Sequence, residues 1–195
     1  MENQSYLFLF IILSSIIFSL FTYLISEYNK LISKKNQIEN VLSSLGVVLK
    51  RRYDLIPNLI ASVKAYMQYE SELLTKITNL RISGLNQNIP VEEKFQIENQ
   101  ISNSLGKLLV SVENYPDLKT NQNFLQLQEA ITEIEEELSA SRRAYNGAIT
   151  AYNNALEMFP SNMIASLMNL TYKNWFEIEE KEKENIDVAK EFNIQ

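Results

Sequence analysis

Apolar and small residues recur every three or four positions along a stretch that runs from Asn121 to Phe159. They are Phe124, Leu127, Ile131, Ile134, Leu138, Ser141, Tyr145, Ala148, Tyr152, Ala155 and Phe159. This alternation is typical of a helix that packs along its whole length in a shallow left-handed supercoil. At ~1.5 Å per residue, such a helix is on the order of 55 Å long. No short helix can cover a stripe of that length, so we expect other helices to line up against it.

A second pattern is an apolar run without a charged side chain, from Tyr6 to Ile25. Fourteen of its twenty residues are Leu, Ile or Phe, and its length matches a hydrocarbon core of ~30 Å. At roughly 0.3 to 0.6 kcal/mol for each such residue, insertion is favoured by about 4 to 8 kcal/mol. A cleaved signal peptide requires Lys or Arg before the run and a small-x-small site after it, and a buried core helix has a polar face. The run has none of these. We therefore predict that residues 1–25 are a short flank and an uncleaved anchor, with residues 6–25 spanning the bilayer.

The heptad spacing continues after the anchor as far as Leu49, which predicts that the anchor runs without a linker into the next helix. Pro57 then predicts a break or kink at residues 52–56, because proline removes a backbone hydrogen bond from a helix interior. A second helix is expected to follow it and to end at a left-handed stop at Gly84.

A third helix is predicted between Pro90 and Val112, and a short apolar turn or helix at residues 163–170, beyond the long helix. These elements predict an all-α fold, in which a transmembrane helix is followed by an elongated antiparallel four-helix bundle. The predicted bundle covers residues 26–176, and an acidic, charge-rich tail covers residues 177–195.

The composition limits the chemistry. Among its 195 residues the chain has no Cys and no His, so it lacks the usual general base, the commonest metal ligand and thiol chemistry. The net charge of −6 disfavours nucleic acid as a partner, since phosphate binding needs a basic face. With only four Gly, phosphate-binding loops and nucleophile elbows are absent as well. We expect no cofactor, no metal and no enzymatic activity.

A series of short motifs stands in a fixed order along the chain. They are Arg51-Arg52-x-Asp54-Leu55-Ile56-Pro57-Asn58-Leu59, Tyr115-Pro116-Asp117-Leu118-Lys119, Asn123-Phe124-Leu125-Gln126-Leu127-Gln128, Arg142-Arg143-x-Tyr145-Asn146, Tyr152-Asn153 and Phe159-Pro160-Ser161-Asn162. In order and spacing they resemble the LemA family of bacterial membrane proteins, over about residues 6 to 177.

That resemblance implies one transmembrane helix followed by a long antiparallel helical bundle, and no established enzymatic activity. It links the chain to membrane protein quality control or, through one branch of the family, to magnetosome membrane biogenesis. The family frequently has glycines where Ser166 and Asn169 stand in this sequence. The difference bears on the flexibility of the segment after Pro160.

The most site-like group comprises Arg51, Arg52, Asp54, Pro57 and Asn58. Two cations and an amide beside a predicted helix break could form a surface for a partner or for lipid headgroups. The alternative is structural: Arg51 or Arg52 forms an ion pair with Asp54 or with an acid on the long helix, which would stabilise the turn. The sequence favours this second interpretation.

The breaker and cap Pro160, Ser161 and Asn162 form a second candidate group, again as a partner surface or a structural turn. Between the two groups lies a repeat, Tyr145-Asn146 and Tyr152-Asn153, spaced by two helical turns. Either the asparagines form an amide ladder for a ligand, or the tyrosines pack in the seam and the asparagines flank them. We favour packing.

Four acids, Glu133 and Glu135 to Glu137, cluster on the long helix. A di-iron or di-manganese centre in a helical bundle uses Glu and Glu-x-x-His ligands from facing helices. Consecutive acids spread over more than half of a helix's circumference, so this cluster is not expected to hold a metal.

These patterns predict a membrane-anchored, non-enzymatic helical scaffold that binds other membrane or peripheral proteins. Two alternatives remain: a receptor-like bundle that binds a small ligand and signals through a partner, and an enzyme that uses carboxylates alone. Lys30, Lys34 and Lys35 follow the span closely and no Lys or Arg precedes it. The positive-inside rule therefore predicts a single-pass protein of the bacterial cell membrane, with the amino terminus outside and the bundle in the cytoplasm. The sequence leaves the oligomeric state open.

Overall fold

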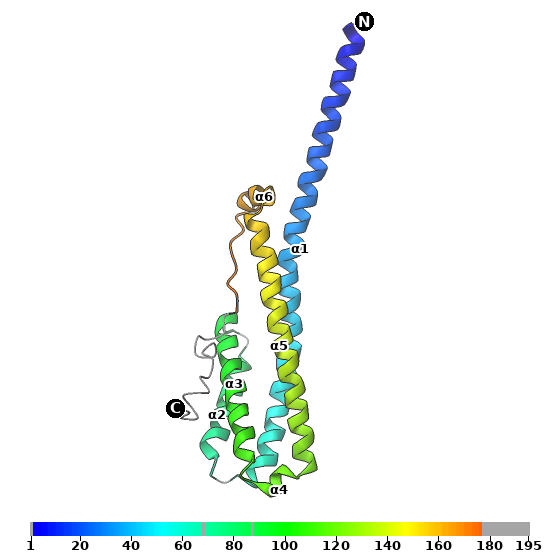
Figure 1. The fold of residues 1–195 in the computed structure, drawn as a ribbon. Coiled ribbons are helices and arrows are strands. Elements are labelled where there is room, and N and C mark those ends of the chain that lie inside the picture. The colour runs from blue at the N-terminus through cyan, green and yellow to red at the C-terminus, as the bar shows by residue number, and fades with distance from the viewer. Residues whose placement is uncertain (1, 68, 87, 177–195) are drawn as a thin grey trace, which may run out of the picture.

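The computed structural model describes residues 2–67, 69–86 and 88–176, and within these ranges the chain is helical and has no strand. The helices are α1 (Glu2–Lys64), α2 (Ser71–Gly84), α3 (Val91–Val112), α4 (Pro116–Lys119), α5 (Gln122–Glu157) and α6 (Ser161–Leu167) (Figure 1). The all-α class is therefore confirmed. The predicted acidic tail, residues 177–195, lies outside the described residues.

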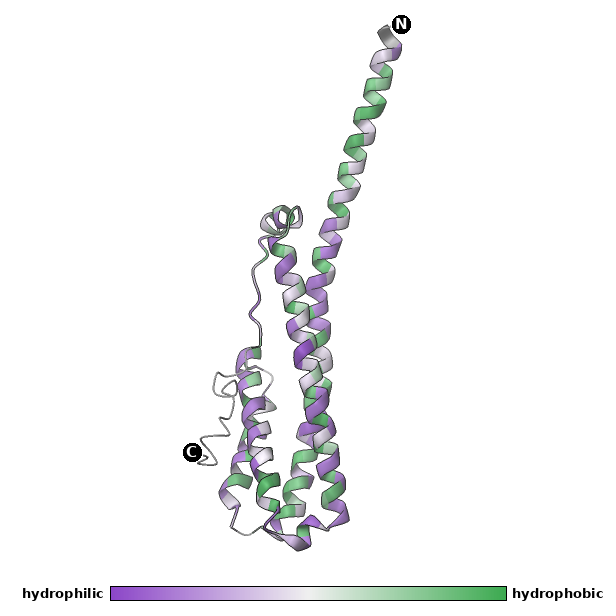
Figure 2. Cartoon of the chain, in the orientation of Figure 1, coloured by the Kyte–Doolittle hydropathy of each residue, from purple (hydrophilic) through white to green (hydrophobic). Residues whose placement is uncertain are grey.

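Helix α1 is the longest helix of the described chain, and it extends from the apolar run into the packed helices. It is 63 residues long, which corresponds to about 95 Å at ~1.5 Å per residue. In the described part of the chain it is the one helix long and apolar enough to cross a membrane, and its most apolar window is not buried at all. Figure 2 shows the apolar amino-terminal part of α1 as a separate stalk above the other helices. The long apolar amino-terminal helix is thus confirmed.

The remainder of α1 packs most extensively against α5, and α2 packs against α3. Figure 1 shows α5 returning beside α1 from the end near α4 towards the stalk. The periodic stretch thus forms one helix, as predicted, and its amino terminus is capped by the Asn121 side chain, which accepts a hydrogen bond from the Phe124 N–H at 3.1 Å. The predicted inward positions of α5 are buried or half-buried except Phe159, which lies beyond the helix and is exposed.

The core is a long, narrow seam of aliphatic and aromatic side chains from all six helices. Its fully buried members with the largest apolar side chains are Tyr152, Phe124, Leu31, Ile56, Leu59, Met67, Ile77, Ile101, Leu105, Leu108 and Leu118. At roughly 1.5–3 kcal/mol for each fully buried large apolar side chain, this seam provides the main free energy that holds the helices together.

The break predicted at residues 52–56 is wrong. Helix α1 continues through Pro57 to Lys64, and the chain turns later, between α1 and α2. The left-handed stop predicted at Gly84 is also wrong, because Gly84 does not have a positive φ. Gly84 instead lies within α2 beside the ring of Tyr53.

A left-handed residue does occur at the end of α6, where Asn169 has φ 51°. The Leu170 N–H donates to the Ala165 carbonyl and the Asn169 N–H to the Ser166 carbonyl. These two bonds form a Schellman motif, which satisfies the last carbonyls of a helix. The chain then reverses and runs back along α5 as a non-helical C-terminal segment, residues 171–176 (Figure 1).

Candidate functional site

Arg52 is fully buried at the centre of the helical body, where α1 faces α3 and α5. Its Nη1 donates to Glu98 Oε2 at 2.9 Å, and its Nη2 donates to Ser102 Oγ at 2.9 Å and to the Glu135 carboxylate. Glu98 is also fully buried, whereas the Glu135 side chain is about one third exposed. One guanidinium thus joins three helices.

The same cluster includes two further hydrogen bonds. The Tyr53 hydroxyl donates to the second oxygen of Glu98, and Ser102 Oγ donates to Glu135 Oε2 at 2.8 Å. Burial raises the pKa of Glu98 above its ordinary value, and the positive charge of Arg52 opposes this rise. Burial likewise raises the pKa of Tyr53 above its ordinary value. Both terminal nitrogens of Arg52 are engaged within this cluster, whereas its Nε is buried without a hydrogen-bond partner among the described residues.

The first predicted group is divided between the interior and the surface. Arg51 is exposed, and its Nη1 contacts both carboxylate oxygens of Glu137 on α5, at 2.8 and 3.0 Å. Asp54, Pro57 and Asn58 are exposed on α1. The ion pairs of both arginines go to neighbouring helices and not to Asp54.

The second predicted group follows the carboxyl end of α5. Pro160 precedes α6, and Ser161 is buried with its hydroxyl donating to the Met158 carbonyl at 2.9 Å. The Asn162 backbone N–H donates to the same carbonyl at 2.8 Å. This turn is far along the helical body from Arg52, so the structure does not bring the two predicted groups together.

The tyrosine–asparagine repeat on α5 has two functions. Tyr145 and Tyr152 are buried in the seam, as the packing interpretation expects. The asparagines, however, form an amide ladder that holds the C-terminal segment. Asn153 Nδ2 donates to the Lys173 carbonyl at 2.9 Å, and its Oδ1 accepts from the Lys173 N–H at 3.0 Å.

Asn146 holds Phe176 in the same two-point manner, with bonds of 3.0 and 2.8 Å. Seven helical residues advance about 10.5 Å, and three extended residues advance about 10 Å. The two asparagines therefore match the repeat of an extended chain running antiparallel to α5. They contact only backbone, so the ladder selects chain conformation and not side-chain identity.

Side chains anchor the end of the C-terminal segment. The Phe176 ring lies 4.4 Å from that of Phe95, centroid to centroid, and the Arg142 guanidinium lies 4.9 Å from its centroid. Trp175 Nε1 donates to Thr150 Oγ1 at 2.9 Å. The segment is thus fixed by its backbone and by one half-buried aromatic ring.

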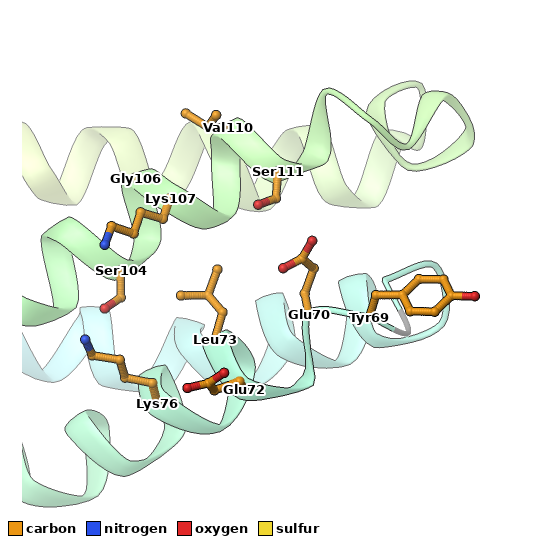
Figure 3. Close-up of a pocket in the computed structure, with 10 residues that line it drawn as sticks. All are labelled: Tyr69, Glu70, Glu72, Leu73, Lys76, Ser104, Gly106, Lys107, Val110 and Ser111. Carbon is orange, nitrogen blue, oxygen red and sulfur yellow. The ribbon is translucent and has the colours of Figure 1, made fainter.

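An open groove of about 690 Å³ lies between α2 and α3. Figure 3 shows Lys76 and Lys107 on either side of Ser104 at one end, and the acids Glu70 and Glu72 nearer the other. Both charge signs line it, and its floor is formed partly by Leu73. This mixed, shallow surface does not converge on a reacting group.

The acid cluster of α5 diverges, as expected. Glu135 and Glu137 face the two arginines of α1, whereas Glu133 and Glu136 line a different, open surface. In the described ranges no three acids are grouped in a way that could hold a metal ion. The buried acid that matters was missed: Glu98 stands between Phe95 and Ile101 on the apolar stripe of α3, and an acid at such a position indicates a buried partner.

An apolar stalk continuous with a helical body defines a membrane-associated, all-helical class of protein. The sequence model of the LemA family matches residues 41–189. The chain is 30% identical over 187 residues to protein LemA of Metamycoplasma hominis, an alignment that covers 96% of this chain and 84% of that protein. This chain therefore belongs to the LemA family.

More distant similarity links the chain to two magnetosome proteins. It is 19% identical over 179 residues to magnetosome protein MamQ 2 of Paramagnetospirillum magneticum, covering 79% of this chain and 66% of that protein. It is 18% identical over 180 residues to magnetosome protein MamQ of Magnetospirillum gryphiswaldense, covering 80% and 66%.

Proposed function

We propose that this protein is a single-pass, membrane-anchored scaffold without a catalytic centre, which binds other membrane or peripheral proteins along its helical body. The observation that carries the proposal is the continuity of α1 from its apolar amino-terminal part into the packed helices. A continuous helix transmits position and orientation, which a flexible linker would lose. Partners bound to the body would thus be held at a defined distance from the bilayer.

The finer architecture belongs to the same proposal. We expect α1, α2, α3 and α5 to act as one antiparallel four-helix bundle, stabilised at its centre by Arg52. The positive charges of Lys30, Lys34 and Lys35 favour the bundle in the cytoplasm of a bacterial cell and the amino terminus outside.

The interior supports a structural function and not a reaction. The two acids that meet at Arg52 could in principle act as an acid and a base. Glu98 is fully buried and already accepts hydrogen bonds from Arg52 and Tyr53, so it faces no open cleft. The same engagement disfavours a ligand pocket at this point, which a receptor-like bundle would require.

The relatives reported above suggest the cellular process only in broad terms. Two are named as magnetosome proteins and one as LemA, and we infer a function in the organisation of membranes or in the quality control of membrane proteins. Asn146 and Asn153 bind an extended backbone. This supports the inference that the fold binds protein segments and not small metabolites.

Crosslinking in living cells tests the scaffold. A photoreactive amino acid is placed at Val110 or Leu125, which are 72% and 46% exposed, and the buried Leu105 is the matched control. We expect discrete adducts with other proteins from the exposed positions and none from Leu105. If none of the exposed positions of the helical body gives an adduct, the scaffold proposal is contradicted.

Labelling tests the orientation. The natural chain contains no Cys, so Val110→Cys provides a unique thiol at the far end of α3. A membrane-impermeant thiol reagent is expected to label it only after the cells are permeabilised. Labelling of intact cells would place the helical body outside.

A further inference from the structure

We propose that the tip formed by the turn after α5 and by α6 (residues 158–170) inserts into the interfacial layer of the same bilayer that α1 spans. The proposal rests on the membrane anchor proposed above and adds a second, non-spanning contact. Its occupant is lipid: the headgroup and upper acyl region beside the point where α1 leaves the membrane. Two contacts would fix the tilt of the helical body, which a single helix leaves free.

The composition of the tip is the first observation. From residue 158 to residue 172 the chain has no charged side chain. Four large apolar side chains in this stretch point into solvent. They are Met158, Phe159, Met163 and Leu167, with exposed fractions of 62%, 80%, 65% and 84%. Exposed apolar side chains gathered at one end of a protein, without charges among them, mark an interaction surface.

The position of the tip is the second observation. Arg51 on α1 is paired with Glu137 on α5, and the two helices run in opposite directions (Figure 1). Twenty residues from this pair towards the stalk, Glu157 at the end of α5 comes level with Leu31 of α1. Leu31 is 1% exposed. Leu31 is six residues beyond Ile25, about 9 Å along the helix. The headgroup region on each side of a bilayer is about 5–8 Å thick. Figure 1 shows α6 beyond the end of α5, on the side of the stalk, so the tip lies nearer the membrane than Glu157 does and within reach of the headgroups.

Exposure along α1 gives an independent measure of that level. Between Tyr6 and Phe21 the large apolar side chains are 55–72% exposed, whereas Tyr23, Leu24 and Ile25 are each 44% exposed. Helix α6 packs against α1, and Figure 1 shows it beside the point where the stalk leaves the body. The last turn of the apolar run, at residues 23–25, is therefore the part of that run nearest to the other helices of this chain.

Lipid fits this surface better than a second protein copy does. Figure 2 shows that the apolar part of α1 leaves the helical body beside the tip. A bilayer that covers Ile25 therefore has its headgroups next to the tip, whereas a second copy would have to associate first. Short apolar segments at this depth bury their side chains about 5–10 Å into the boundary between headgroups and acyl chains.

The experiment measures depth at the tip in the full-length chain. Single cysteines replace Leu167 or Met163 and carry an environment-sensitive fluorophore. The chain is reconstituted into vesicles of phosphatidylethanolamine and phosphatidylglycerol that contain nitroxide-labelled lipids. Leu13→Cys in the apolar run and Val110→Cys at the far end of α3 are the deep and aqueous controls. We expect a blue-shifted emission and strong quenching by headgroup-level nitroxides at positions 163 and 167, and neither effect at 110.

A charge at the tip provides a second readout. In a chain with Leu167→Glu, the label at residue 163 is expected to lose most of its blue shift and quenching, because a carboxylate is costly to desolvate. Since residue 167 is exposed, this change leaves the packed core intact.

The controls separate the possible failures. If Leu13→Cys is quenched by deep nitroxides and both tip positions behave like Val110→Cys, the tip proposal is overturned and the anchor stands. If Leu13→Cys is not quenched, the anchor fails and this proposal fails with it. A blue shift at the tip that is insensitive to lipid nitroxides and disappears on dilution of the protein would assign the tip to a second copy, and would also overturn the proposal.

Discussion

The side chain of Arg81 supplies the hydrogen bond that Pro57 withholds from Tyr53. In an α-helix the N–H of residue 57 would bond to the carbonyl of residue 53, and proline has no N–H. Arg81, on α2, donates from Nε to the Tyr53 carbonyl at 2.6 Å. A neighbouring helix thus repairs the ladder of α1, which explains why α1 does not end at its proline.

Removal of the Arg81 donor should destabilise the protein, because the Tyr53 carbonyl then has no hydrogen-bond partner. Arg81→Met keeps most of the packing, and we expect it to lower the free energy of unfolding by about 1–3 kcal/mol, because a half-buried carbonyl loses its partner. Denaturant unfolding in detergent micelles, followed by circular dichroism, measures the change. In a chain with Pro57→Ala the N–H is restored, so Arg81→Met should cost much less. An equal cost in both backgrounds would contradict this explanation.

The ion pair of Arg52 and Glu98 is expected to matter more when one partner is removed than when both are. Arg52→Met leaves the fully buried Glu98 without its cation, and such losses typically cost about 3–5 kcal/mol. The double variant Arg52→Met with Glu98→Met removes both charges and should recover much of this stability. The same unfolding measurement applies. A double variant as unstable as Arg52→Met alone would show that the pair is not the reason for the loss.

Gly84 provides a test of close packing. A Cβ on Gly84 would lie 2.8 Å from Tyr53 Cζ and closer still to the hydroxyl oxygen, so the ring would have to move from its hydrogen bond with Glu98. We expect Gly84→Ala to destabilise the chain by about 1–3 kcal/mol. The matched control is Gly147→Ala, where nothing lies within 4 Å of the added carbon and a gain of roughly 0.5–1 kcal/mol is expected. If both variants have the same melting temperature, the predicted clash does not exist.

Each rung of the amide ladder should protect one amide of the C-terminal segment. Asn153→Ala is expected to speed hydrogen exchange at the Lys173 N–H, and Asn146→Ala at the Phe176 N–H, with a smaller effect at the other position. Exchange measured by nuclear magnetic resonance resolves the two amides. Unchanged exchange in both variants would mean that the asparagines do not hold the segment in solution.

Much of the architecture follows from periodicity, because one long apolar stripe demands long partners. The α5 stripe and the apolar run of α1 both appear at the predicted positions. The prediction failed where a local rule was overridden by a distant contact: Pro57 reads as a break in sequence, and only the packing of α2 brings Arg81 to its carbonyl. A pattern within one segment cannot report a donor that lies 24 residues away.

The site was less accessible to sequence reasoning for a related reason. Arg51 and Arg52 were expected to pair with Asp54 or with the long helix, and they do contact Glu137 and Glu135. The fully buried Glu98, which Arg52 also contacts, was not among the candidate residues. The asparagine repeat was visible as a spacing, but its partner is a segment without any periodic pattern.

The central claim is that one unbroken helix joins the membrane span to the helical body, and a distance across the junction tests it most directly. Spin labels at Phe21→Cys and Val47→Cys, both exposed in α1, are separated by 26 residues, which is about 39 Å along a continuous helix. Pulsed electron spin resonance on the full chain in lipid nanodiscs should give one narrow distribution near that value. A broad distribution with shorter distances would show a flexible junction and contradict the account.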